Sequence, residues 1–315
     1  MSTTTVNGVR LRYDVQGDGP PLLLIAGLGL SSLAWAAAVP RLREGFTVIT
    51  FDNRGTGLSE VPPGPYPIDT LGDDAAALVE HLGVGPVSAV GWSLGGSVLQ
   101  SMLVRHGDVL SKAVLLNAFP SYTGVQDAWL DAGLALRRAG VDPVAIGIHG
   151  MPWAFTPRLL ADHAATEAQA ELARKDPHPT TLAGFEAQAA GLRVYDSRAD
   201  LPSATTPTLV LAGAEDVLTP VAQSVEMAEL LPHGTLQVLP RGGHGMLVEY
   251  LDDTLAAIIA YLGADPRARP RPVGPVGPVG AVGAAAEPVG TAVAVIGAGR
   301  PVVLPDDLAD TPQVR

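Results

Sequence analysis

The 315-residue sequence contains no cysteine, few lysines and no long hydrophobic run. Without cysteine, the chain has no disulfide, thiolate nucleophile or cysteine-based metal site. Acidic residues outnumber basic ones by 32 to 20, and the resulting net charge of −12 disfavours a nucleic-acid-binding surface. The apolar run LLLIAGLGL is too short to span a bilayer, and MSTTTVNGVRLRY lacks the pattern of a secretory signal. We therefore expect a cytoplasmic protein with a small-molecule partner, and no nucleic-acid or membrane partner.

The hydrophobic content of 47% is sufficient for a sizeable core. After an exposed hairpin strand near residues 9–15, short apolar runs alternate with segments of helical period. The apolar runs cover residues 22–26, 46–51, 87–90, 114–116, 208–212 and 236–239. Continuous apolar strands that alternate with helices predict an α/β fold, with a mostly parallel central sheet flanked by helices on both faces.

Two stretches depart from this alternation. Between residues 120 and 202, helical pieces separated by prolines predict an inserted helical cap over a core formed by residues 1–119 and 203–262. Residues 263–315 are rich in proline, glycine and valine, which predicts a disordered tail. The tail contains AVAVIGAGRPVV, but Val302 replaces the third glycine of a dinucleotide fingerprint and Pro301 interrupts its helix, so we interpret the match as coincidental.

The stretch GWSLG surrounds Ser93 with small residues, directly after an apolar run and directly before a helical segment. Gly91 precedes the serine by two residues, and Gly95 and Gly96 follow it. A serine at so tight a strand-to-helix turn has a strained backbone, and larger neighbouring side chains would collide. In this context G-x-S-x-G is typical of a nucleophilic serine whose hydroxyl stands clear of the sheet.

A serine hydroxyl needs a base that takes its proton. Of the seven histidines, His244 lies in a glycine-rich loop after the last core strand, where a parallel sheet presents catalytic loops, and we assign the other six to surface or structural roles. The imidazole needs a carboxylate that fixes its tautomer, and Glu215 and Asp216 follow the preceding strand. We choose Asp216, with Glu215 as the alternative, because adjacent residues at a strand end point in different directions.

An attacked carbonyl also needs hydrogen-bond donors for the negative charge that develops on its oxygen. The turn after Ser93 aims the backbone N–H of Leu94 at this space, and the loop after residues 22–26 offers the N–H of Leu28 as a second donor. These elements follow one another in the order nucleophile, acid, histidine. Their order and their places at strand ends predict a Ser93, Asp216, His244 triad.

With these motifs, residues 6–262 of the chain resemble the α/β-hydrolase superfamily, and in particular its capped serine esterases and lactonases. The similarity extends to enol-lactonases and to cofactor-free haloperoxidase-like esterases. The resemblance implies an α/β-hydrolase fold whose cap lies between the sixth and seventh core strands. Many members carry His-Gly at the end of the oxyanion strand, whereas this chain has Ala26-Gly27. Dehalogenases and capped epoxide hydrolases carry aspartate as the nucleophile, and Ser93 argues against both.

The stretch FDNRGTGLSE, residues 51–60, is similar to one typical of the single-domain members of that superfamily. We expect a structural role for it, in which Asp52 and Arg54 organise a loop and Gly55 and Gly57 permit its turn.

The predicted reaction is hydrolysis of a small to medium, largely apolar carboxylic ester or lactone through an acyl-enzyme on Ser93. It requires no metal and no organic cofactor. Two alternatives stay open, because the same triad serves acyl transferases, cyclases and perhydrolases, and because a slow-turnover small-molecule-binding protein would have a similar sequence.

Large apolar side chains near the triad and in the insertion are candidates for lining a substrate pocket, with packing of the cap onto the sheet as the alternative. They are Trp35, Trp129, Trp153, Phe155 and Met246. By resemblance to enol-lactonases, arginines of the insertion would instead select a carboxylated substrate, with simple solvation as the alternative. These arginines are Arg137, Arg138, Arg158 and Arg193.

Overall fold

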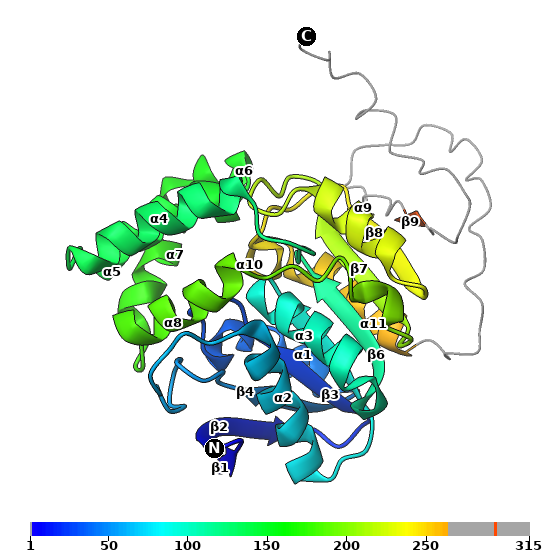
Figure 1. Cartoon of the computed structure of the whole chain (residues 1–315). Coiled ribbons are helices and arrows are strands. Elements are labelled where there is room, and N and C mark those ends of the chain that lie inside the picture. Colours follow the sequence, from blue (N-terminus) through cyan, green and yellow to red (C-terminus); the bar gives the residue numbers. More distant parts are fainter. Residues whose placement is uncertain (1, 264–292, 295–315) are drawn as a thin grey trace, which may run out of the picture.

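The computed structural model describes residues 2–263 and 293–294. These residues form a nine-stranded sheet in the order β1-β2-β4-β3-β5-β6-β7-β8-β9 (Figure 1). Six neighbouring strands run parallel to one another, namely β4, β3, β5, β6, β7 and β8. The remaining strands β1, β2 and β9 at the two edges pair antiparallel. The predicted α/β architecture with a mostly parallel sheet is therefore confirmed.

The six parallel strands are short, and all except β8 are almost continuously buried, as expected for a sheet covered on both faces. They are β3 (Pro21–Ile25), β4 (Thr47–Phe51), β5 (Val87–Trp92), β6 (Leu110–Leu116), β7 (Thr208–Gly213) and β8 (Gly234–Leu239). Each apolar run identified in the sequence falls on one of these strands. The structure begins β6 earlier than the sequence predicts, because polar Ser111 and Lys112 interrupt the apolar signal at its start.

The N-terminal edge of the sheet is a hairpin of β1 (Ser2–Val6) and β2 (Val9–Gln16). Asn7 and Gly8 connect the strands with φ of 47° and 71°, which is the turn conformation that Asn-Gly favours. Only β2 was expected from the sequence. Four of the five residues of β1 are serine or threonine, so that strand has no apolar alternation to reveal it.

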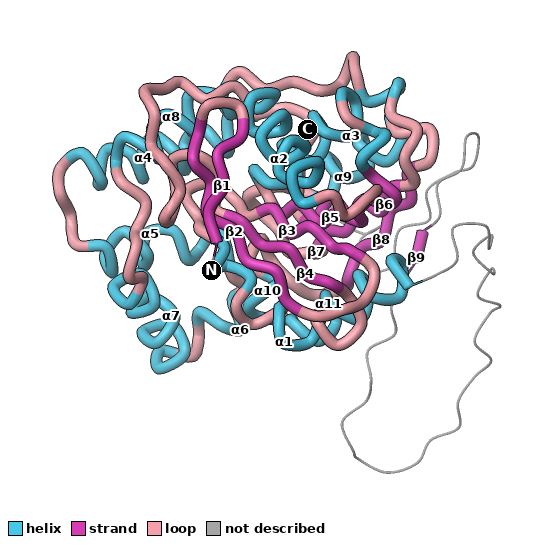
Figure 2. Tube along the Cα trace, turned by 90° about the horizontal axis from the view of Figure 1, so that it is seen from below, coloured by secondary structure: helices cyan, strands magenta, loops and turns pink. Residues whose placement is uncertain are grey.

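Helices cover both faces of the sheet (Figure 2). The first face carries α2 (Ile68–Leu82), α3 (Leu94–Arg105) and α9 (Val221–Leu230), and the second carries α1 (Val39–Leu42) and α11 (Leu251–Gly263). Alternation along the strands divides the core between them. In β3, Leu23 and Ile25 pack into the cluster of the first face, and Leu22 and Leu24 into that of the second.

Helices are inserted between β6 and β7, where the sequence predicts a cap (Figure 1). They are α4 (Gly124–Arg138), α5 (Pro143–Ala154), α6 (Pro157–Leu160), α7 (His163–Lys175) and α8 (Leu182–Arg193). Helix α8 is the most deeply buried of them, and its Ala187 and Leu192 join the core cluster of the first face. The boundaries of the cap at residues 120 and 202 stay predictions.

Two segments with helical composition form shorter helices than expected. Residues 31–44 contain only the 3₁₀ turn η1 (Ser32–Trp35) and the single turn of α1, because Pro40 cannot donate the hydrogen bond that a continuous helix would need there. Residues 246–263 divide into α10 (Met246–Glu249) and α11, and Tyr250 between them leaves the helical region with φ −130° and ψ 48°.

The predicted disorder of residues 263–315 falls mostly outside the described residues. Within that stretch, Gly263 ends α11, and Val293–Ala294 forms β9, which pairs antiparallel with Leu236 and Gln237 of β8. The disorder of the tail stays a prediction. In the part of the chain that the structure describes, no helix has both the length and the apolar character needed to cross a membrane.

Candidate active site

Ser93 occupies the sharp turn between β5 and α3, with φ 57° and ψ −120°. Residues with a side chain rarely adopt this conformation. The N–H of Ser93 donates to the carbonyl of Leu116 at 3.0 Å, and its own carbonyl accepts from Gly96 at 2.8 Å. Trp92 and Leu94 on either side are buried, whereas Ser93 is partly exposed. The strained turn therefore presents one hydroxyl from an otherwise buried segment.

The glycines around Ser93 are required by the space available. A methyl group at Gly91 would collide with the carbonyl of Gly95, and a methyl group at Gly95 would collide with the carbonyl of Ile25 on β3. At Gly96 it would collide with the Cβ of Ala118. These atoms are backbone or Cβ atoms that cannot move aside cheaply, so the expectation that small residues permit this turn is confirmed.

His244 and Asp216 meet where β7 and β8 end. Nδ1 of His244 lies 2.9 Å from Oδ2 of Asp216, and the two side chains are 9% and 0% exposed. Asp216 follows β7 and His244 follows β8, so these parallel strands bring together two residues that are 28 positions apart. The contact uses Nδ1 and leaves Nε2 on the opposite edge of the ring for another partner.

Donors surround the carboxylate of Asp216. Its Oδ1 accepts from the N–H groups of Leu218 and Thr219 at 2.9 and 2.8 Å, and its Oδ2 accepts from the hydroxyl of Thr219 at 2.6 Å. That hydroxyl also lies 3.2 Å from Nδ1 of His244. Hydrogen bonds of this kind stabilise an ionised carboxylate and fix its orientation. The carboxylate of Asp216 is therefore held in one position beside the imidazole.

Glu215, the alternative acid, points elsewhere. Its Oε2 accepts from the N–H of Gly242 at 3.0 Å, and its own N–H donates to the carbonyl of Gly242 at 3.1 Å. Glu215 thus holds the start of the loop that carries His244, and Asp216 contacts the ring itself.

Two residues that the sequence analysis did not single out hold the loop of His244. Asn117, which follows β6 with φ 43°, donates through Nδ2 to the carbonyls of Gly243 and His244, both at 3.0 Å. Its Oδ1 accepts from the N–H of Gly213 at 3.2 Å. Nε1 of Trp92 donates to the same His244 carbonyl at 3.0 Å. A polar residue directly after a buried strand was the available signal for Asn117.

The turn formed by residues 27–30 lies beside Ser93. The N–H of Leu30 donates to the carbonyl of Gly27 at 3.1 Å, and a methyl group placed on Gly27 would lie 3.4 Å from Cβ of Ser93. Among the described residues, the N–H groups of Leu28 and Leu94 have no acceptor. Leu94 is the first residue of α3, where a helix leaves its N–H groups without intrahelical partners. Unpaired N–H groups near a serine can receive an anionic oxygen.

The loop of residues 51–60 has the structural role expected of it. The carboxylate of Asp52 accepts from the N–H groups of Ser32 and Leu58 at 2.7 and 3.0 Å. The guanidinium of Arg54 forms two hydrogen bonds with Asp74 on α2, at 2.6 and 2.7 Å. Gly55 and Gly57 have positive φ.

A family model described as the alpha/beta hydrolase fold matches residues 20–249. This span runs from the start of β3 to the end of α10 and contains Ser93, Asp216 and His244. The chain belongs to the alpha/beta hydrolase family.

Similar proteins are known from several bacteria. "Putative carbamate hydrolase RutD" of Caulobacter sp. (strain K31) is 31% identical over 273 residues, which cover 84% of this chain and 99% of that protein. "3-oxoadipate enol-lactonase 2" of Acinetobacter baylyi is 31% identical over 242 residues, which cover 75% and 87%. The crystal structure of the enol-lactonase from Burkholderia xenovorans LB400 superposes with a TM-score of 0.75 at 26% identity, and covers 84% of this chain and all of that one. These similarities support hydrolase activity.

Two of the expected pocket residues belong to the core of this alpha/beta hydrolase. Trp35 and Met246 are 0% exposed and lie in the apolar cluster on the second face of the sheet. The ring of Trp35 packs edge-on against Trp92, with 6.4 Å between ring centroids, so it supports the indole that holds the His244 loop. Burial of large apolar side chains in this cluster explains the correction, since both residues gain more from packing there than from a position in a cleft.

The other three candidates lie in the insertion of the hydrolase and are partly exposed. Trp129 packs against the small cluster of Leu130, Leu134, Phe185 and Ala189. Phe155 lies against Gly245, the residue after His244, and the N–H of Gly245 donates to Ala154 at 2.6 Å. The end of α5 therefore contacts the His244 loop. Pocket roles for Trp129, Trp153 and Phe155 stay predictions.

Three of the four arginines considered for substrate selection are paired within the hydrolase. Arg138 pairs with Glu186, Arg158 with Glu249 and Arg193 with Asp131. Arg137 differs from them. Its guanidinium lies 4.2 Å from the centroid of the Phe185 ring, and no acidic side chain within residues 2–263 or 293–294 pairs with it. Its Nε is buried without a partner, and burial holds the pKa of the group below its usual value.

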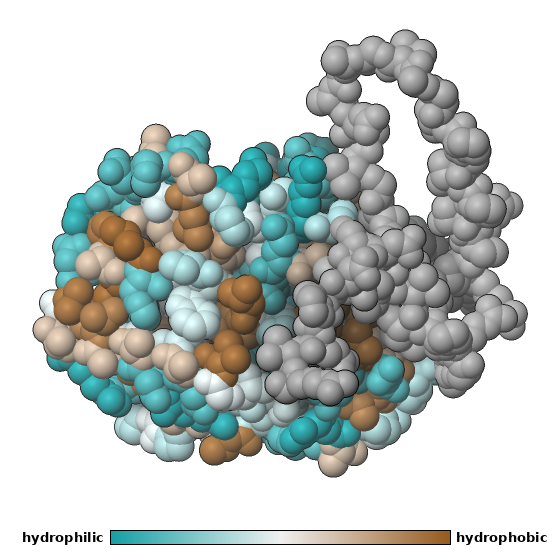
Figure 3. Space-filling view, turned by 90° about the horizontal axis from the view of Figure 1, so that it is seen from above, coloured by the Kyte–Doolittle hydropathy of each residue, from teal (hydrophilic) through white to brown (hydrophobic). Residues whose placement is uncertain are grey.

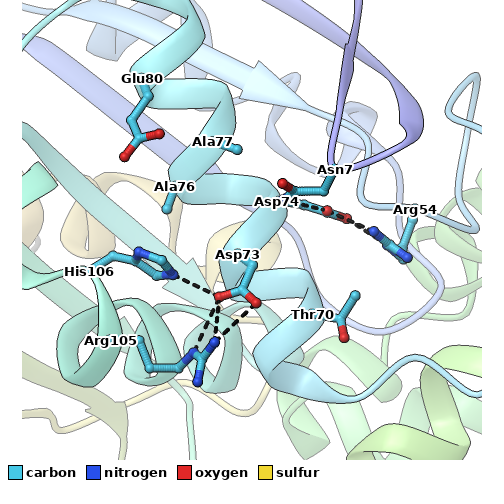
Figure 4. A pocket seen from close by; sticks show the side chains of 10 residues that line it. All are labelled: Asn7, Arg54, Thr70, Asp73, Asp74, Ala76, Ala77, Glu80, Arg105 and His106. Carbon is cyan, nitrogen blue, oxygen red and sulfur yellow. Dashed lines mark hydrogen bonds and ion pairs between the residues drawn. The ribbon is translucent and has the colours of Figure 1, made fainter.

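A polar cavity of about 470 Å³ opens beside α2 and involves neither Ser93 nor His244 (Figure 4). Most of its charged residues pair with one another, Arg54 with Asp74, and Asp73 with both Arg105 and His106. We interpret these pairs as links between α2, α3 and the 51–60 loop. Across the described residues, no three His, Asp or Glu side chains gather in a group that could hold a metal ion.

Proposed function

We propose that this alpha/beta hydrolase is a serine hydrolase of carboxylic esters or lactones. Ser93 is the nucleophile, His244 is the general base, and Asp216 orients and stabilises the imidazole. One joint observation carries the proposal. The strained, partly exposed Ser93 directly follows β5, and the buried hydrogen bond between His244 and Asp216 joins the loops that follow the parallel strands β7 and β8, at the same end of the strands.

In the proposed reaction, the Oγ of Ser93 attacks the substrate carbonyl carbon while Nε2 of His244 takes the hydroxyl proton. The tetrahedral intermediate collapses when the imidazolium of His244 protonates the departing alkoxide, which leaves an acyl-enzyme. Water, deprotonated by His244, then attacks the acyl carbon and releases the acid and Ser93.

The N–H groups of Leu28 and Leu94 are the proposed donors to the oxyanion. Their support is the lack of any other described acceptor and the packing of the 27–30 turn against Ser93. Fixed N–H donors of this kind contribute a large part of the rate enhancement in acyl transfer. No step of this mechanism uses a metal or an organic cofactor.

The proposed substrate is a small to medium, largely apolar ester or lactone held between the insertion and the strand ends. Trp129, Trp153 and Phe155 supply partly exposed aromatic surface on that side. Seen from above, the molecule shows apolar side chains scattered among polar ones (Figure 3). Exposed apolar residues of the insertion include Ile148 and Leu172.

One observation favours a carboxylate on that substrate. Arg137 has no acidic partner among the described residues, and its guanidinium stacks on Phe185, whose ring lies against Gly29 in the 27–30 turn. A guanidinium whose Nε–H is buried without an acceptor loses hydration without compensation, and an anionic group on the substrate would supply a partner. The relative in Acinetobacter baylyi is named for 3-oxoadipate, a dicarboxylic acid.

A matched pair of chromogenic esters tests both the serine mechanism and the preference for a substrate with a carboxylate. 4-Nitrophenyl butyrate is neutral, and mono-4-nitrophenyl succinate carries a carboxylate at the end of an acyl chain of the same length. We expect wild type to hydrolyse both, with a higher kcat/KM for the succinate, and Ser93→Ala to hydrolyse neither. Equal turnover by Ser93→Ala and wild type would overturn the serine mechanism.

Product analysis separates hydrolysis from transfer, and an added carbamate tests the substrate class. With methanol present, a hydrolase yields mostly free acid, whereas methyl ester as the main product would show acyl transfer. A 4-nitrophenyl N-alkylcarbamate turned over faster than either ester would move the substrate to carbamates and keep the same triad. Ligand-induced stabilisation without turnover of any of the three would favour the binding-protein alternative.

A further inference from the structure

The inserted helix α8 and Thr180 just before it contact the turn that carries Leu28 at three points, all on one residue. Oε1 of Gln188 accepts the N–H of Gly29 at 3.0 Å. The hydroxyl of Thr180, just before α8, donates to the carbonyl of Gly29 at 2.9 Å. The ring of Phe185 occupies the position that a side chain at residue 29 would need. Both backbone polar groups of Gly29 are therefore bound by the insertion.

This turn has a defined geometry that the contacts preserve. The hydrogen bond from Leu30 to Gly27 closes a four-residue turn, and φ of Gly29 at its third position is 67°. A positive φ at that position is characteristic of a type II turn. Rotation of the peptide between Leu28 and Gly29 would convert it to type I and turn the Gly29 N–H away from its acceptor. Gln188 therefore holds the turn in one of two accessible forms.

Gln188 also connects this turn to the neighbouring loop. Its Nε2 donates to the carbonyl of Arg54 at 2.9 Å, so the two ends of one amide join the loops that follow β3 and β4. The side chain is 0% exposed. A fully buried amide with both ends paired to backbone is strongly constrained in position, because removal of either bond leaves a buried polar group unsatisfied.

We infer that Gln188 is a positioning residue for the oxyanion hole. It fixes the 27–30 turn, which packs against Ser93 through Gly27 and carries the N–H of Leu28, and it makes α8 part of the scaffold that supports this turn. This inference rests on the proposed function, since Leu28 is an oxyanion donor only if Ser93 is the nucleophile. Gln188 acts through the turn, and its hydrogen bonds are with Gly29 and Arg54, not with Ser93 or His244.

The test compares Gln188→Leu with Gln100→Leu. Gln100 is equally buried and its amide is also paired at both ends, with the carbonyl of Phe119 at 3.0 Å and the hydroxyl of Ser197 at 2.7 Å, but it does not contact the turn. Loss of a whole oxyanion donor costs about 10²–10³ in kcat, so a mispositioned donor is expected to cost about 10–100-fold. We expect Gln188→Leu to lose this much in kcat with KM within about twofold of wild type, and Gln100→Leu to lose stability with kcat retained.

Two further readouts keep the inference testable. Amide hydrogen exchange in a peptide that spans residues 27–30 should be faster in Gln188→Leu than in Gln100→Leu, and this requires no activity. If Gln188→Leu does not fold, Thr180→Val removes the other hydrogen bond at a partly exposed position and should lower kcat several-fold.

Equal kcat and equal exchange in the two glutamine variants would overturn the inference and leave the proposed function standing. Failure of wild type to turn over any ester would overturn the proposed function together with the catalytic part of the inference. The exchange measurement would in that case still decide whether Gln188 orders the turn.

Discussion

Oδ2 of Asp216 lies 2.9 Å from Nδ1 of His244, and the two residues bring the ends of adjacent parallel strands into a single buried contact. Glu215, one residue earlier, directs its carboxylate to the N–H of Gly242. Adjacent residues at a strand end point in different directions, so only one of the two carboxylates reaches the imidazole.

Substitution of these two acids should therefore have unequal effects on catalysis. Asp216→Asn is expected to lower kcat by about 10⁴, because an amide favours the wrong imidazole tautomer and cannot stabilise the charged ring. Glu215→Gln is expected to keep kcat within a few-fold, because a neutral amide oxygen still accepts from Gly242. Steady-state turnover of 4-nitrophenyl butyrate measures both. Equal losses would contradict the assignment of Asp216 as the acid.

The turn at Ser93 should not tolerate the addition of even one methyl group to its glycines. Gly95→Ala places Cβ against the carbonyl of Ile25, so we expect a loss of several-fold or more in kcat and a clear drop in melting temperature. The matched control is Gly133→Ala in the interior of α4, where Cβ meets no atom within 4 Å. That variant should gain about 0.4–1 kcal/mol in unfolding free energy. Thermal unfolding and kcat together give the comparison, and a harmless Gly95→Ala would contradict the steric argument.

Substitution of Arg137 should lower substrate selectivity without lowering the stability of the fold. Burial holds its pKa below the usual value and no acidic side chain described in the structure compensates the charge, so Arg137→Met is expected to leave the melting temperature unchanged or raise it. The same variant should lose the preference for mono-4-nitrophenyl succinate over 4-nitrophenyl butyrate. Arg138→Met, which removes an exposed ion pair with Glu186, is the control and should keep the preference. Retained selectivity in Arg137→Met would exclude the arginine from substrate recognition.

Asn117 should matter for both folding and turnover. Asn117→Ala removes the donors to Gly243 and His244 and the acceptor of Gly213, and unsatisfied buried groups cost about 1–3 kcal/mol each. Urea unfolding should show a large loss of stability, and kcat should fall because the His244 loop loses its support. Wild-type kcat in a destabilised Asn117→Ala would show that Trp92 alone positions the loop.

The sequence predicted the parts of this molecule that depend on local pattern. The buried strands show as apolar runs, and the turn at Ser93 shows through its glycines, because steric requirements there leave few choices of residue. The hairpin strand β1 has no apolar alternation, and the one-turn α1 follows from Pro40 within a segment of helical composition.

Contacts between residues far apart in the chain could not be predicted from the sequence. Trp35 and Met246 were expected in a pocket on the basis of their positions beside the oxyanion and histidine loops, but they turn into the core. Asn117 and Gln188 contact residues 126 and 159 positions away, and no periodicity marks such partners. The four arginines likewise look alike in the sequence, and only the positions of Glu186, Glu249 and Asp131 show that Arg137 differs.

The most direct test of the serine mechanism is intact mass after exposure to a fluorophosphonate, measured on wild type, Ser93→Ala and His244→Ala. We expect one adduct on wild type, none on Ser93→Ala and little on His244→Ala, because phosphonylation needs the nucleophile and its base. Loss of ester turnover on the order of 10⁶ in kcat should accompany Ser93→Ala. A folded wild type that takes no label, or a label that persists in Ser93→Ala, would contradict an activated serine at the end of β5.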